Sequence, residues 1–139
     1  DEAITSFNRA LDLVPDRWTY HFNLARAQGL LEHWDEAIAG YKRAAELFPN
    51  DYVTHFNLGL ALHKHGDHAG AVEAYLKAVA LAPTDASFRM ALGISYERLQ
   101  KPADAAAAYS EYLRLSPGAA DADKVRGHVA ALTSQPAGG

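Results

Sequence analysis

The 139-residue sequence has no cysteine, which excludes disulfide bonds, thiolate metal ligands and cysteine nucleophiles. It also has no glycine-rich phosphate-binding loop and no serine nucleophile motif. Acidic side chains such as Glu73, Glu97 and Glu111 are spread over different helix faces and form no acid–base pair. We therefore predict a protein that is not an enzyme and needs no cofactor.

Long apolar runs are missing as well. None approaches the roughly 20 residues that a membrane-spanning helix needs, and no charged-then-apolar leader is present, so we expect no membrane insertion. The sequence begins at Asp1 inside a helical pattern, without an initiator methionine. We interpret it as a fragment of a longer protein, and the sequence leaves open whether an N-terminal targeting segment is missing from it. Its localisation is therefore unknown, and the cytoplasm is only the default that the lack of cysteine allows.

Neither positive nor negative charge dominates the chain. It has 17 acidic and 13 basic residues, fairly evenly mixed, and a formal net charge of −4. This balance gives no electrostatic reason to expect nucleic acid as a partner. With 49% hydrophobic residues, the chain can bury one continuous core, and its length fits a single domain.

Of the six prolines, four are spaced 34 residues apart: Pro15, Pro49, Pro83 and Pro117. Other positions recur at the same period. Three such columns are Ala3, Ala37, Ala71 and Ala105; Phe7, Tyr41, Tyr75 and Tyr109; and Leu13, Leu47, Leu81 and Leu115. A constant period of this length indicates one structural unit repeated in tandem.

Each unit shows two helical segments joined by a short turn. Apolar residues recur at helical spacing, and Gly66-Asp67 and Pro102 mark turns within a unit. One unit cannot bury both of its faces, so neighbouring units must stack. The pattern predicts helices over residues 2–14, 17–31, 34–48, 51–65, 68–81, 85–99, 102–115 and 120–133.

The sequence thus predicts an all-α protein, a right-handed α-solenoid of tandem 34-residue helix–turn–helix repeats with about seven helices and a C-terminal capping helix. The single domain covers residues 1–134. It divides into a half repeat at 1–17, full repeats at 18–51, 52–85 and 86–119, and a capping helix at 120–133. We expect residues 134–139 to form a flexible tail.

These columns resemble those of the tetratricopeptide repeat family. The resemblance covers about residues 1–134 and includes the Leu-Gly pairs at 58–59 and 92–93, Tyr96, the alanine and tyrosine columns, Ala44, Ala78 and the four prolines. It implies a protein-interaction scaffold whose first helices line a concave groove. His21 and His55 depart from the family, which often has tryptophan or a large aliphatic residue in their column.

We expect the groove to be lined by first-helix residues that do not face the partner helix. They are Thr19, Phe22, Asn23, Arg26, Val53, Phe56, Asn57, Leu60, Lys64, Met90, Ile94 and Arg98. An extended peptide or an amphipathic helix of another protein suits such a groove.

Asn23 and Asn57 occupy one column of this groove, and each amide offers a donor and an acceptor to a peptide backbone. The column resembles the asparagine ladders of the peroxisomal targeting-signal receptor and of O-GlcNAc transferase, although Ala91 and Val125 interrupt it. The alternative is that both amides bond within their own helices or to water.

The apolar row of Phe22, Phe56 and Met90 either contacts a partner or packs internally as the floor of the groove. A clamp for the C-terminal carboxylate of heat-shock chaperones is not expected. The family's clamp needs lysine and arginine in columns where this chain has Phe22, Ser87 and Ala91.

His63, His65 and His68 surround one turn and raise the question of a metal site. His63 and His65 are two residues apart on a helix and point to different sides, so they do not easily share a metal. His68 belongs to the next helix. We interpret the group as a solvated turn and leave metal binding open.

The sequence therefore predicts a non-catalytic scaffold that binds a peptide or amphipathic helix of another protein in its groove. Two alternatives remain. One is a self-assembly segment that associates through exposed terminal helices. The other is the recognition arm of a larger enzyme, such as a glycosyltransferase. The identity of the partner is not readable from the chain, because one scaffold hosts many functions.

Overall fold

The computed structural model describes residues 1–134, which contain eight α-helices and no strand. The helices are α1 (Glu2–Leu13), α2 (Trp18–Leu30), α3 (Trp34–Leu47), α4 (Tyr52–His65), α5 (His68–Leu81), α6 (Ala86–Arg98), α7 (Pro102–Leu115) and α8 (Ala122–Thr133). The prediction of a helical solenoid with seven helices and a capping helix is confirmed. The tail predicted at 134–139 lies outside the described residues, apart from Ser134.

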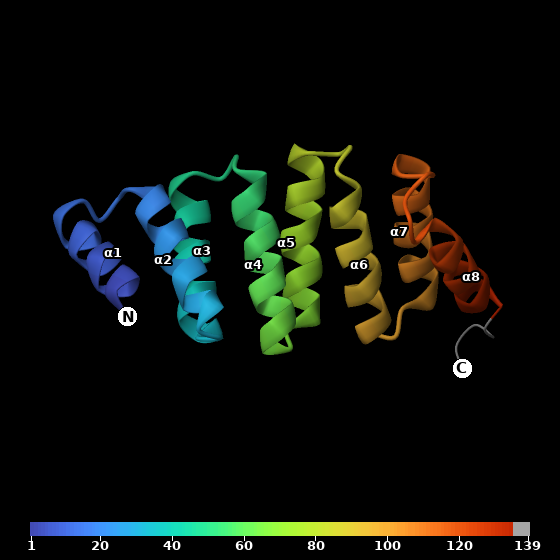
Figure 1. Ribbon diagram of the computed structural model, residues 1–139, viewed down its shortest axis with the longest axis horizontal. Helices are drawn as coiled ribbons and strands as arrows, with labels where there is room; N and C mark the ends of the chain where they lie inside the picture. Colours follow the sequence, from blue (N-terminus) through green and yellow to red (C-terminus); the bar gives the residue numbers. More distant parts are fainter. Residues whose placement is uncertain (135–139) are drawn as a thin grey trace.

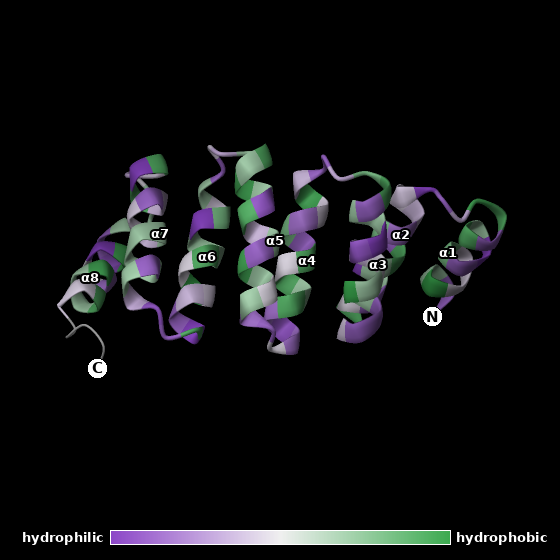
Figure 2. Cartoon of the chain, turned by 180° about the vertical axis from the view of Figure 1, so that it is seen from behind, coloured by the Kyte–Doolittle hydropathy of each residue, from purple (hydrophilic) through white to green (hydrophobic). Residues whose placement is uncertain are grey.

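The helices stand side by side in one row along the long axis (Figure 1). Packing is densest within the hairpins α2–α3, α4–α5 and α6–α7, and α3–α4, α5–α6 and α7–α8 join one hairpin to the next. In Figure 1 α2 lies in front of α3, and in the opposite view α3 lies in front of α2 (Figure 2). Contacts between the first helices α2 and α4 also occur, so we call α2, α4 and α6 the first layer and α3, α5 and α7 the second layer.

Aspartate side chains cap the N-termini of several helices. Asp51 accepts hydrogen bonds from the backbone N–H of Thr54 at 3.2 Å and from its hydroxyl at 2.6 Å. Asp67 accepts the N–H of Gly70 at 2.8 Å, and Asp85 accepts the N–H of Ser87 at 3.0 Å. Each carboxylate satisfies an N–H that has no partner within the first turn of its helix. Asp51 and Asp85 are one period apart, so α4 and α6 both begin with a capping aspartate, which accepts an N–H three residues on in α4 and two residues on in α6.

The turn inside each hairpin is closed by a residue with left-handed backbone geometry. Glu32, Gly66 and Gln100 are spaced 34 residues apart and have φ angles of 60°, 95° and 58°. The N–H of the next residue then reaches back five residues, as at Asp67, which donates to the Leu62 carbonyl at 2.8 Å. This closure satisfies carbonyl groups at the end of the first helix. Only the middle unit has glycine, the residue that adopts this geometry without a steric penalty.

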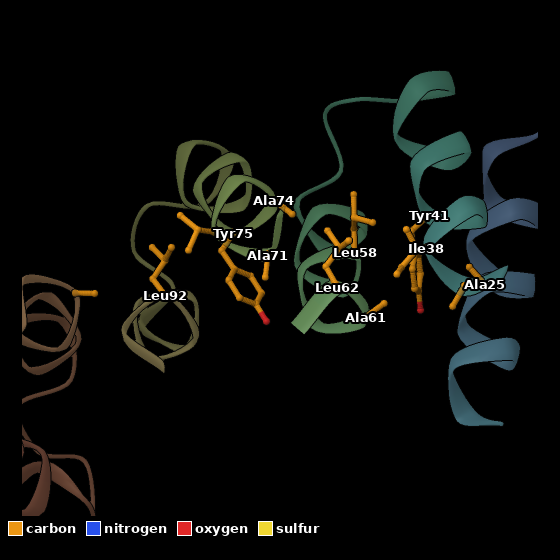
Figure 3. Packing of buried hydrophobic residues seen from close by; sticks show 13 residues of the cluster. Ala25, Ile38, Tyr41, Leu58, Ala61, Leu62, Ala71, Ala74, Tyr75 and Leu92 are labelled. Atoms are coloured by element: carbon orange, nitrogen blue, oxygen red, sulfur yellow. The ribbon is translucent and has the colours of Figure 1, made fainter. Parts of the chain in front are cut away.

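Buried side chains from successive helices form one continuous core from α2 to α7 (Figure 3). Tyr41 and Tyr75, one period apart, are 5% and 1% exposed. A second cluster, which includes Tyr109 and Val125, joins α7 to α8. The helix α1 buries no residue completely.

Small residues set the distance between the two helices of a hairpin. A Cβ atom at Gly59 would lie 2.4 Å from Cε1 of Tyr75, so the aromatic ring rests on the glycine backbone. In the hairpin α2–α3 the glycine is on the second helix instead of the first. The position equivalent to Gly59 is Ala25, and its partner helix has Gly40, where a Cβ would lie 2.9 Å from the Ala25 Cβ. Each hairpin thus has one glycine at its closest approach, on one helix or the other.

Candidate functional site

The twelve predicted groove residues all lie on α2, α4 and α6, and we call the surface that they mark the first-helix face. Arg26, Lys64 and Arg98 are exposed. Val53, Leu60 and Ile94 are each about 40% exposed; the remaining members are half-buried and are Thr19, Phe22, Asn23, Phe56, Asn57 and Met90.

The two asparagines retain free amides. Asn23 and Asn57 lie one period apart on α2 and α4, and both are half-buried. Neither amide hydrogen-bonds to another group within residues 1–134. The alternative in which each amide bonds within its own helix is therefore not what the structure contains. The next position of the column is Ala91, so α6 has no third amide.

The two aromatic residues of the apolar row, Phe22 and Phe56, pack inward against the core. The ring of Phe22 lies 5.7 Å from the ring of Tyr41, and Phe56 lies 5.7 Å from Tyr75 and 4.9 Å from Phe88. These rings extend the core toward the first-helix face and form its floor. The apolar surface that stays accessible on this face belongs instead to Val53, Leu60 and Ile94. It also includes Leu30, which is 82% exposed and was not predicted.

Burial and nearby charges change the pKa values of three tyrosines beneath this face. Burial raises the pKa of Tyr41 to about 12, and the positive charge of Arg26 opposes part of that rise. Burial also raises the pKa of Tyr75 well above its ordinary value. The pKa of Tyr109 is raised by burial first and then by its hydrogen bond to Glu97. The three hydroxyls therefore stay protonated at neutral pH.

A cleft of about 540 Å³ lies at the C-terminal end of the stack, between α6, α7 and α8. We call it the C-terminal cleft. Met90 is the only predicted residue that lines it; its other lining residues are Tyr109, Asp121, Lys124, Val125, Gly127, His128 and Ala131. Beside it, the Glu97 carboxylate accepts the Tyr109 hydroxyl at 2.8 Å and lies 2.5 Å from His128 Nε2. Sequence reasoning missed this cleft because residues 120–133 were interpreted only as a capping helix.

A second hollow of about 600 Å³ lies between α3 and α5 and contains none of the twelve predicted residues. Its floor includes Leu58 and Leu62 from α4. Its rim includes Lys42, Glu46, Glu73 and Lys77, whose opposite charges alternate and give the hollow no dominant sign. The short side chains of Ala45 and Ala74 are the sequence signal for this hollow.

The histidines do not converge on a metal site. His63 Nδ1 lies 3.1 Å from His68 Nδ1, whereas His65 Nε2 points to Asp35, at 3.2 Å. Within residues 1–134 no group of three or more histidine, aspartate or glutamate side chains has a metal-binding arrangement. The pKa of His63 is lowered by burial first, and then by His68, Arg98 and Lys64.

His21 and His55 have structural partners instead. Their Nε2–H groups donate to the carbonyl oxygens of Pro15 at 2.6 Å and Pro49 at 2.7 Å. Each bond ties a first helix to the end of the helix before it, which explains a polar residue in this column.

Of the helices in the described part of the chain, none has the length and apolar character required to cross a bilayer.

Comparison with known proteins assigns these repeats to a family. A family model described as "Tetratricopeptide repeat" matches residues 1–52, 31–86, 80–120 and 90–137. No curated protein sequence matches the chain.

Several solved structures share the fold. A crystal structure of MamA protein has a TM-score of 0.86 and 21% identity, over 94% of this chain and 71% of that one. The first TPR of Spaghetti (RPAP3), bound to the HSP90 peptide SRMEEVD, has a TM-score of 0.74 and 24% identity, over 84% and 94% of the two chains. The Arabidopsis OM64 TPR domain has a TM-score of 0.73 and 18% identity, over 82% and 94%. At these identities the likeness concerns the fold.

Proposed function

Because the chain belongs to the tetratricopeptide repeat family, whose members are typically non-catalytic protein-interaction scaffolds, we propose that its first-helix face binds an extended peptide of a partner protein. The observation that carries the proposal is the pair of free, half-buried amides of Asn23 and Asn57. An asparagine amide donates to a peptide carbonyl and accepts from a peptide N–H, whatever the peptide's side chains. Two amides one repeat apart therefore hold a chain along the stack.

The exposed apolar residues supply the second part of the binding surface. Leu60 and Ile94 are one period apart, and Val53 lies on the same helix as Leu60. They offer contacts to the side chains of a bound segment, whether it is extended or an amphipathic helix. The RPAP3 domain was solved with a peptide bound, which supports peptide binding as a mode open to this fold.

The test is a peptide-library screen followed by Asn57→Ala. We expect the variant to bind the best peptide about thirtyfold more weakly, because two hydrogen bonds of roughly 1 kcal/mol each are lost. Its melting temperature should not change, because the amide has no partner within the described chain. Asn8→Ala on α1 is the matched control, since Asn8 is exposed and lies outside the first-helix face. Equal peptide affinity of Asn57→Ala and the unmodified protein would refute the proposal.

Self-association is a second candidate function, favoured by two exposed leucines. Leu13 and Leu30 are 84% and 82% exposed, and α1 buries no residue completely. Apolar side chains this accessible favour contact with another copy. Light scattering over a range of concentrations tests it. A mass that rises with concentration, and no longer rises in Leu13→Ser, supports self-association; a constant monomer mass excludes it.

A further inference from the structure

We infer that copies of this chain join end to end, with α8 of one copy and α1 of the next packed together as one further helical hairpin. The inference rests on the second candidate function, self-association, and names the two surfaces that meet. The helices α1 and α8 lie at opposite ends of the row (Figure 1). Each therefore offers a terminal face to a neighbouring copy.

The helix α1 has the register of a second helix but no first helix beside it. Its main packing partner is α2, which belongs to the next unit. Ala3 and Phe7 occupy the alanine and tyrosine columns. The equivalent alanines and tyrosines of α3, α5 and α7 are 0% and at most 5% exposed, whereas Ala3 is exposed and Phe7 is only half-buried. Within residues 1–134, the face of α1 that a first helix would cover is therefore accessible.

The helix α8 has the complementary register, that of a first helix, and within residues 1–134 no second helix follows it. Gly127 is one period beyond Gly93 and two beyond Gly59. At each of those two glycines, a Cβ atom would lie 2.4 Å from a tyrosine ring of the partner helix. At Gly127 a Cβ atom would meet no atom within 4 Å in the described chain, so the same place on α8 can receive a ring.

A solvated capping helix explains the charged residues of α8 but not this glycine. Glycine within a helix is less favourable than alanine, and a face that only meets water gains nothing from it. In α4 and α6 the glycine is needed because a tyrosine ring rests on the helix backbone. Gly127 therefore keeps α8 suited to the same contact with a second helix.

The ring of Phe7 from the next copy fits the surface around Gly127. In the hairpins α2–α3 and α4–α5, the residue three positions before the small residue is Phe22 or Phe56, whose ring lies 5.7 Å from the tyrosine ring of the same hairpin. On α8 that position is Lys124, and both Lys124 and Gly127 line the C-terminal cleft. A phenyl ring placed there contacts the aliphatic stem of the lysine, and its face attracts the ammonium group. The cleft thereby receives an apolar occupant.

Charges at the proposed contact are complementary. Within the hairpin α6–α7, the pKa of the Glu111 carboxyl is lowered first by its hydrogen bond to Arg114 and further by the charge of Arg89 on α6. One period further along, Asp123 on α8 takes the place of Arg89. Arg9 on α1 of the next copy takes the place of Glu111. Both signs are reversed, so the pair is again attractive, and Arg9 and Asp123 are both exposed.

The contact joins two different surfaces, so each added copy leaves one α1 face and one α8 face accessible. Assembly of this kind continues into chains or closes into rings. We expect the mass of the unmodified protein in light scattering to rise beyond that of a dimer between about 0.01 and about 1 mM, since a contact of one helix pair is small and weak.

Blocking one face at a time tests the pairing. Ala3→Gln places a long side chain on the α1 face, and Gly127→Gln places one on the α8 face. Both positions are exposed, so the melting temperature should not fall. Because overpacking disrupts a close helix contact, each variant alone should associate at least about tenfold more weakly. Ala107→Gln, the matched control at an exposed position of α7, should associate like the unmodified protein.

Mixing the two variants gives the decisive measurement. The mixture contains one intact pairing, between α8 of Ala3→Gln and α1 of Gly127→Gln. We expect equal amounts of the two to form a dimer and nothing larger. In the unmodified background, Arg9→Asp should weaken association about two- to fivefold, and the further change Asp123→Arg should restore it.

The outcomes separate this interface from self-association itself. If the unmodified protein associates but the mixed variants form no dimer, the pairing of α8 with α1 is wrong and another surface joins the copies. A constant monomer mass at all concentrations refutes both the pairing and self-association, and leaves the two terminal faces to helices of another protein. Neither result depends on peptide binding at the first-helix face, because Asn57 lies on α4, away from both terminal helices.

Discussion

The contact between Gly59 and the ring of Tyr75 makes a quantitative prediction about hairpin packing. A methyl group at position 59 would lie 2.4 Å from Cε1 and 2.5 Å from Cδ1 of a ring that is only 1% exposed. Overpacking of this kind destabilises a core by about 1–3 kcal/mol, and the higher helix propensity of alanine returns up to about 1 kcal/mol. We expect Gly59→Ala to lower the free energy of unfolding by about 1–2 kcal/mol.

Chemical denaturation followed by circular dichroism measures this loss. Gly127→Ala is the control, because Gly127 lies within α8 and a Cβ there meets no atom within 4 Å. Gly127→Ala gains the higher helix propensity of alanine without a steric clash. It should therefore be more stable than the unmodified protein by about 0.5–1 kcal/mol. If Gly59→Ala were as stable as Gly127→Ala, the ring contact would not set the helix spacing.

The hairpin α2–α3, in which the glycine is on the second helix, suggests a second substitution that restores part of the lost stability. Ala25 and Gly40 are the equivalents of Gly59 and Ala74, with the glycine on the opposite helix. Combining Gly59→Ala with Ala74→Gly therefore recreates the packing of α2–α3 in α4–α5. We expect the double variant to lose about 1 kcal/mol less than the sum of the single losses. Strict additivity would show that the two positions do not share the contact.

Three further predictions concern turns, pH and hydrogen bonds. Gln100→Gly should stabilise the protein by about 0.5–1 kcal/mol in thermal denaturation, because its φ of 58° is strained for a residue with a side chain. The pKa of Tyr41 is raised to about 12, so the folded state holds this proton more tightly than the unfolded chain does. The associated stability is present below about pH 10 and is lost as pH rises through about 12; Tyr41→Phe should show a smaller loss than the unmodified protein in denaturation at pH 8 and about pH 11. His55→Phe should lower the free energy of unfolding by about 1–2 kcal/mol in urea, since the Pro49 carbonyl loses its donor, and the more exposed His21→Phe should lower it less.

The solenoid could be predicted from the sequence because each structural constraint is repeated. The tyrosine column fills the space between paired helices, and Tyr41, Tyr75 and Tyr109 are all buried. One such residue is weak evidence, but the same residue at a constant period reports the same environment several times. The layer that carries the candidate site followed from the same periodicity.

Features that depend on exact distances were not predictable. Helical spacing places Phe22 and Phe56 on the first-helix face, but their depth depends on ring positions in the neighbouring helix, and both rings pack on tyrosines. The left-handed geometry of Glu32 and Gln100 was not predictable, because neither residue is glycine. There the closing backbone hydrogen bonds determine the geometry, and local residue preference does not.

The stack also separates stability from recognition within each first helix. On α4, Leu58 and Gly59 face the core, whereas Asn57 and Leu60 on either side of them reach the first-helix face. A solenoid buries its core between helices and leaves one side of each first helix accessible, so these columns change independently. The amides of Asn23 and Asn57 follow this division, because no hydrogen bond within residues 1–134 requires them. The proposed peptide, which would span the repeats, accounts for residues that the fold does not need yet places in register along one face.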